Sequence, residues 1–109
     1  MSRRIQKINE LLKQEISSLI LKELDFSREI IITVTKVETP LDLEWAKIWV
    51  SILPFSRAEM VLGVLNSKNY NIQKLLNQKL KMKIIPKIKF ELDNSEEKAS
   101  RVEKLLKNI

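Results

Sequence analysis

The sequence predicts an α+β two-layer sandwich, in which helices cover one face of a three-stranded sheet and leave the other face open. Apolar side chains recur every three or four residues in four segments, which is the period of an amphipathic helix. Three other segments alternate or are rich in β-branched residues, as strands are. The resulting order is α-β-β-α-α-β-α, and the two-helix connection favours a crossover back to the same sheet.

The first half of the chain predicts one helix and a β-hairpin. Residues 3–24 carry a single apolar stripe, and residues 30–37 form a β-branched run. A turn segment at 39–44 leads to a second strand at 45–53. Along that strand one face is apolar, and the other consists of Trp45, Lys47, Trp49 and Ser51. This alternation predicts a half-buried strand paired with the preceding one.

The second half predicts two helices, a third strand and a last helix. The helix that begins near Arg57 is interrupted by polar residues at 66–69, and helical spacing resumes from Ile72. From Leu80 to Leu92 the period changes to two, with apolar side chains at even positions and mostly lysines at odd ones. Pro86 indicates that this strand lies at an edge or contains a bulge. Val102, Leu105 and Leu106 mark the last helix.

The bulk composition predicts a small globular protein. The length of 109 residues favours one domain over 1–109, and the hydrophobic content of 44% is sufficient for one core. The chain has no cysteine, so we expect no disulfide framework. It has no apolar run near the roughly 20 residues of a membrane helix. We therefore expect a cytoplasmic protein.

The positive charge is concentrated in the second half of the chain. Basic and acidic residues balance within 1–54, so the net charge of +6 arises in 55–109. No acidic residue occurs between Glu59 and Glu91, whereas seven lysines do. Clustered ammonium groups bind polyanions by releasing counterions from phosphates. The asymmetry therefore predicts a polyanionic partner.

The residue types present argue against catalysis. The chain contains no histidine and no cysteine, which removes the commonest general base, the thiolate nucleophile and the usual zinc ligands. Its one glycine cannot make a phosphate-binding glycine-rich loop. We expect no enzyme, no metal and no cofactor.

Three features are candidates for contact with nucleic acid, and each has a structural alternative. The break at 66–69 could hold a phosphate at the start of the second helix, or be a plain connection. The lysines of 74–83 could bind phosphates, or form a solvated helix face. The tryptophans and lysines of the open sheet face could stack single-stranded bases. Alternatively, the tryptophans pack under a neighbouring element and the lysines protect an edge strand.

Several segments together resemble the Ribosome-binding factor A family. They are Arg4-Ile5 with 19–25, the hairpin segments 32–38 and 41–51, Leu65-Asn66-Ser67, 80–83 with 86–90, and 93–95 with Arg101-Val102 and Leu105-Leu106. The resemblance spans nearly the whole chain, and it rests on the combination and order of the segments. It implies a type II KH-like fold. The family usually has an Ala-x-Gly kink between its two central helices, and the matching positions here are Lys68, Asn69 and Tyr70.

The resemblance further implies a monomeric RNA-binding factor of ribosome biogenesis. Such a factor binds 16S rRNA and the free, immature 30S subunit, and supports late rRNA processing and cold adaptation. In some bacteria a ribosome-assembly GTPase helps to release it. We expect Asn69 to supply the kink through the left-handed backbone region. The alternatives are a KH-type or sheet-face module for another single-stranded RNA, and a basic module that docks an acidic protein.

The predicted RNA contacts all fall between the break and the third strand, and Arg3 and Arg4 could add charge. The predicted site consists of Ser67, Lys68, Asn69, Lys74, Lys79, Lys81, Lys83, Lys87 and Lys89.

Overall fold

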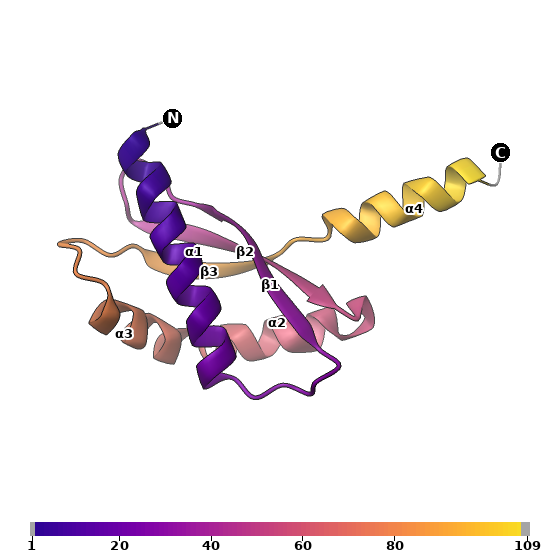
Figure 1. Cartoon of the computed structure of the whole chain (residues 1–109), viewed down its shortest axis with the longest axis horizontal. Coiled ribbons are helices and arrows are strands. Elements are labelled where there is room, and N and C mark those ends of the chain that lie inside the picture. Colours follow the sequence, from indigo (N-terminus) through magenta and orange to yellow (C-terminus); the bar gives the residue numbers. More distant parts are fainter. Residues whose placement is uncertain (1, 108–109) are drawn as a thin grey trace.

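The computed structural model describes residues 2–107, except for the side chains of Glu96, Glu97 and Ser100. The predicted order of elements is confirmed, with one short 3₁₀ turn added (Figure 1). The elements are α1 (Arg3–Glu23), β1 (Ile31–Glu38), β2 (Trp45–Leu53), η1 (Phe55–Arg57), α2 (Ala58–Ser67), α3 (Asn69–Lys79), β3 (Lys87–Leu92) and α4 (Ser95–Lys107).

The sheet has the order β1-β2-β3, so β2 is its central strand. The predicted hairpin is confirmed: β1 and β2 are antiparallel, with an irregularity in register between Val34 and Lys36. β3 runs parallel to β2, with Trp45 opposite Lys87 and Val50 opposite Leu92. Parallel neighbours need a crossover connection, which α2 and α3 provide. β3 is an edge strand, as Pro86 indicated.

The core lies between one face of this sheet and the helices α1, α2 and α3. Leu12, Leu65 and Leu76, one from each of these helices, are fully buried, as is Ile48 of β2. Burial alternates along β2, so the residues between the core positions face away from the helices. Trp45, on that outer face, is 51% exposed. The two-layer sandwich with one open sheet face is therefore confirmed for these three helices.

The last helix departs from the prediction that helices lie on one face. Figure 1 shows α4 extending away from the body of the molecule. Its apolar residues Val102, Leu105 and Leu106 are all more than half exposed. Within the described residues, no helix is both long and apolar enough to cross a membrane.

The third strand begins later than its alternating pattern predicted. Residues 80–86 form an extended loop, and pairing with β2 begins only at Lys87. The backbone N–H of Lys87 donates to the carbonyl of Glu44, 3.0 Å away, just before β2 begins. Residues 80–86 therefore have no strand beside them to pair with, because the chain at 40–44 is a turn.

The outer edge of β3 is closed by side chains of α3. Ile88 directs both backbone polar groups away from β2: its N–H donates to Gln73 Oε1 at 2.8 Å, and its carbonyl accepts from Asn69 Nδ2 at 3.1 Å. Gln73 Nε2 also donates to the carbonyl of Pro86 at 3.1 Å. Asn69 and Gln73 are four residues apart, so they lie on the same face of α3. The edge is therefore capped by amides in place of another strand.

A second polar junction joins β1, β3 and the start of α4. Thr35 donates its hydroxyl to Asp93 Oδ2 at 2.6 Å, and Ser95 donates both its hydroxyl and its backbone N–H to Asp93 Oδ1. The Ser95 hydroxyl, followed by Thr35 and the Ser95 N–H, holds the pKa of Asp93 below the ordinary value of 3.8. Lys36 adds a smaller favourable charge.

We predict that Gln73→Ala lowers the free energy of unfolding by about 1–3 kcal/mol, because it leaves two partly buried backbone groups without partners. Urea unfolding monitored by circular dichroism measures the change. Gln78→Ala is the matched control, because Gln78 is exposed on the same helix. We expect it to change stability by less than about 0.5 kcal/mol. If both variants lost the same unfolding free energy, the stabilising role of Gln73 at the edge of β3 would be contradicted.

We also predict that the stability gap between the wild type and Asp93→Asn depends on pH. The pKa of Asp93 is lower in the folded state, so its carboxylate stabilises the fold fully above the unfolded-state pKa. That contribution is lost as the pH falls through the folded-state pKa. Urea unfolding at about pH 6 and about pH 3 should therefore show the gap narrowing in acid. If the difference in unfolding free energy between the wild type and Asp93→Asn were larger at low pH, the stabilising role of the Asp93 carboxylate would be contradicted.

Candidate nucleic-acid interface

The joint between α2 and α3 is a single residue, Lys68. Its backbone angles are φ −95° and ψ 3°, in the sparsely populated bridge region. Its N–H donates to the carbonyl of Val64 at 3.0 Å, and its carbonyl accepts from the N–H of Ile72 at 3.0 Å. The predicted break is confirmed. The prediction that Asn69 bends the chain through the left-handed region is wrong, because Leu43 is the only non-glycine residue with positive φ within residues 2–107. The joint therefore forms without glycine.

Two predicted phosphate contacts at this joint are already engaged. The Ser67 hydroxyl donates to the carbonyl of Val64 at 2.8 Å. Asn69 uses its amide nitrogen to close the edge of β3, and its Oδ1 is buried with no hydrogen-bond partner in the described part of the chain. Lys68 is exposed, and Tyr70 is 79% exposed. Lysine and tyrosine are therefore the side chains that the joint offers to a ligand. Tyr70 was not among the predicted contacts, although the resemblance matched it to the last position of the Ala-x-Gly kink.

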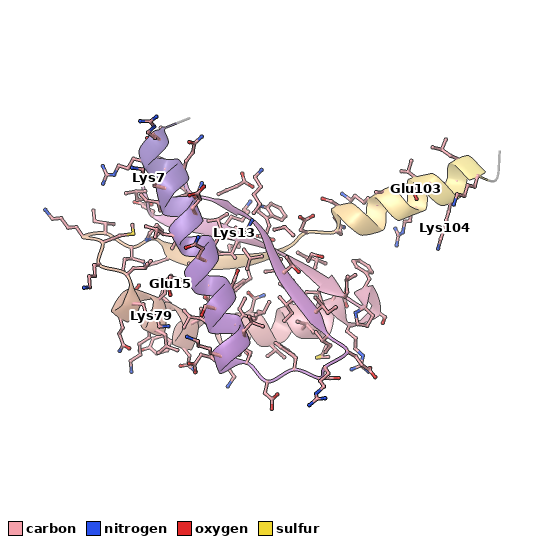
Figure 2. The ribbon with its side chains drawn as sticks, viewed as in Figure 1. Lys7, Lys13, Glu15, Lys79, Glu103 and Lys104 are labelled. Atoms are coloured by element: carbon pink, nitrogen blue, oxygen red, sulfur yellow. The ribbon has the colours of Figure 1, made fainter. Side chains whose placement is uncertain are left out.

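The lysines of α3 and the loop after it are all exposed. Lys74 and Lys79 lie on α3, and Lys81 and Lys83 lie on the loop at 80–86. Lys79 falls on the apolar stripe of α3 by its spacing, yet it is exposed because the helix ends at this residue (Figure 2). The ion pairs among the described residues, Lys36–Glu38 and Lys89–Glu91, include none of these four. Their charges are therefore available to an anionic ligand.

The fold brings Lys83 to the start of α1. It lines a hollow of about 490 Å³ together with Arg3, Arg4 and Lys7. The remaining lining is apolar and consists of Ile8, Leu11, Leu43, Met82 and Ile84. Lys7 was not among the predicted contacts. The sequence predicted that Lys7 lies on the same helix as Arg3 and Arg4. Its proximity to Lys83 could not be predicted, because it depends on the tertiary fold.

Lys87 and Lys89 lie on a different surface, the open face of the sheet. Lys87 Nζ is 5.6 Å from the centroid of the Trp45 ring, and Lys89 Nζ is 3.6 Å from Glu91 Oε1. On the same face Lys47 Nζ is 5.3 Å from the centroid of the Trp49 ring. Cations and indole rings therefore lie together there, as the alternation along β2 predicted.

The seven predicted lysines thus form three groups. Lys68 forms the joint and Lys74 follows it on α3; Lys79, Lys81 and Lys83 continue from the end of α3 to the start of α1; Lys87 and Lys89 face outward from the sheet. Figure 2 shows Lys7 and Lys79 on the body of the molecule, far from Lys104 on α4. Solvated lysines at this density suit sequence-independent contact with a phosphate backbone.

The comparisons with known proteins identify the family. The family model of Ribosome-binding factor A matches residues 4–106. The Ribosome-binding factor A of Thermodesulfovibrio yellowstonii is 35% identical over 107 residues, which cover 98% of this chain and 91% of that protein.

Solved structures agree on the fold. The crystal structure of ribosome-binding factor A from Thermus thermophilus has a TM-score of 0.69 at 18% identity, covering 81% of this chain and 94% of that one. A homology model of the Thermus thermophilus factor, fitted into the cryo-EM map of a 30S complex, gives a TM-score of 0.62 at 18% identity, covering 87% of this chain and 97% of that one. The structures share the KH-like fold. The match over residues 4–106 and the identity to the Thermodesulfovibrio protein show that this chain belongs to the Ribosome-binding factor A family.

Proposed function

We propose that this protein binds the 16S rRNA of the immature small ribosomal subunit and supports late rRNA processing and 30S maturation without catalysis of its own. The family is one of ribosome-binding factors, which are not a class of enzyme. The Thermus relative is described in a complex with the 30S subunit. We further propose that the protein acts in the cytoplasm as a monomer, and that an assembly GTPase releases it.

The observation that carries the proposal is the lysine surface from Lys68 to Lys83. It has four exposed lysines on α3 and the following loop, with no acidic residue in that stretch of sequence. An ordinary solvated helix mixes both signs of charge, because like charges on one face repel. A polyanion would relieve this repulsion by replacing the small counterions around the lysines.

The proposed RNA contacts are Lys68, Lys74, Lys79, Lys81 and Lys83, with Lys87 and Lys89 on the sheet. The Ser67 hydroxyl and the Asn69 amide are not among them, because both donate to carbonyls of this chain. The two alternatives predict different behaviour. A KH-like module for another RNA would bind RNA but not the small subunit. A module that docks an acidic protein would bind that protein, and its affinity for RNA would depend only weakly on salt concentration.

We predict that the triple variant Lys79→Ala, Lys81→Ala, Lys83→Ala binds single-stranded RNA more weakly. Loss of three phosphate contacts should reduce the slope of log affinity against log salt by about 2 between about 50 and 200 mM. Fluorescence anisotropy with labelled 16S rRNA fragments measures both quantities.

The matched control is Lys98→Ala, Lys104→Ala, Lys107→Ala, which removes the same charge from α4, away from the body of the molecule. We expect its salt slope to stay within error of the wild type. If the two triple variants changed affinity and slope equally, overall charge rather than the proposed surface would determine binding.

We also predict that the protein sediments with free 30S particles, and not with 70S ribosomes, when cell extract is separated on a sucrose gradient. The lysine triple variant of α3 and its loop should move toward the top of the gradient, whereas the α4 variant should stay with the 30S fraction. Wild-type protein found only at the top would contradict the proposed association with the small subunit.

A further inference from the structure

The open sheet face carries a slot beside Trp45, and phosphate contacts alone do not explain its aromatic wall. It has a volume of about 550 Å³ and is lined by Trp45, Lys47 and Lys89, with Ala46, Ile88 and Asn69. The side chains of Ala46 and Ile88 are buried on the helix side of the sheet, so these residues contribute backbone to the floor of the slot. Asn69 brings the slot next to the α2–α3 joint.

The two tryptophans of β2 have different surroundings. Trp49 is only partly exposed: its indole N–H donates to Glu38 Oε1, and Lys47 lies over its ring. Glu91 is its neighbour on β3. Trp45 is 51% exposed, it has no described hydrogen bond from its indole, and its neighbour on β3 is Lys87. Trp49 is therefore held by the sheet, and Trp45 presents its ring to a ligand.

The charged side chains that line the slot, and the residue opposite Trp45 on β3, are all lysines. Lys87 lies opposite Trp45, Lys47 follows two residues later on the same face, and Lys89 lines the slot. No carboxylate is among the lining residues of the slot. Glu91 lies 3.6 Å from Lys89, and Glu38 is the neighbour of Lys47 on β1. Among these three lysines, the charge of Lys87 is therefore the least compensated by nearby carboxylates.

We infer that this slot binds one unpaired base of a single-stranded RNA. The base stacks on the indole ring of Trp45, and Lys47 and Lys87 contact the phosphates on either side of it. Lys87 interacts with an exposed ring only weakly, so a base can replace it over the indole. The inference rests on the proposed function for its ligand class, and it adds a base-binding site on the sheet to a phosphate-binding surface on α3 and its loop.

A nucleotide fits this slot better than an acidic peptide does. A flat ring uses the face of the indole, and stacking on an aromatic side chain is tolerant of base identity. Beside the slot, the edge of β3 is also less available to a peptide strand, because Asn69 and Gln73 occupy the backbone groups of Ile88.

The test uses the two tryptophans of the chain separately. In Trp49→Phe, Trp45 is the remaining tryptophan; in Trp45→Phe, it is Trp49. Each variant is titrated with a seven-nucleotide oligoadenylate and with an oligomer of the same length that lacks its bases. We expect oligoadenylate to quench Trp45 and leave Trp49 nearly unchanged, and the baseless oligomer to quench neither.

The same oligoadenylate is bound to Trp45→Ala, whose fold is checked by circular dichroism and thermal unfolding. We expect its affinity to fall about 5-fold to 150-fold, the loss of one stacked base, and Trp45→Phe to recover most of it. Suppose that Trp45→Ala binds the oligoadenylate like the wild type, while the triple lysine variant of α3 and its loop binds it more weakly. The inferred base-binding site is then contradicted, and the proposed RNA binding stands. If the wild type binds no RNA, both proposals fail.

Discussion

The closed edge of β3 determines which surfaces of this protein can bind a partner. Ile88 would otherwise present a free N–H and a free carbonyl to solvent or to another strand. Gln73 and Asn69 satisfy both groups, and in doing so they fix α3 against the sheet. Lys68 remains exposed beside this edge, and Asn69 also lines the Trp45 slot. The same two bonds therefore remove the pairing groups of Ile88 from the edge and hold α3, which carries Lys74 and Lys79, against the sheet.

Much of the fold could be predicted because it depends on local periodicity. The stripe of α1 and the alternation of β2 each reflect a face that is buried along its whole length, and both elements match their expected bounds closely. The open face followed from the same alternation, since Trp45 and Lys47 cannot share the core side with Ala46 and Ile48. The lack of acidic residues between Glu59 and Glu91 likewise predicted a basic surface without any knowledge of its shape.

The remaining features depend on contacts between residues far apart in sequence. Residues 80–86 alternate like a strand, yet they lack a partner because β2 begins only at Trp45. Lys83 meets Arg3 and Lys7 because the loop passes the start of α1, which no spacing in the sequence indicates. The role of Asn69 was missed for a similar reason: its hydrogen bond is to a residue nineteen positions away. Val102 and Leu105 have a helical spacing, but a spacing does not say whether another element covers them.

The sign of charge along β3 separates two regions of the open face. The strand begins with Lys87 and Lys89, continues with Glu91, and is followed by Asp93. Because β3 is parallel to β2, this order places cations beside Trp45 and a carboxylate beside Trp49. Glu38 on β1 strengthens the division, since it accepts the Trp49 indole N–H and pairs with Lys36 at 3.7 Å. A phosphate near Trp49 would meet carboxylates, whereas one near Trp45 would meet lysines. Because the two strands are parallel, the order of charges along β3 makes the open face basic at the Trp45 end and acidic at the Trp49 end. A bound RNA strand would therefore lie at the Trp45 end.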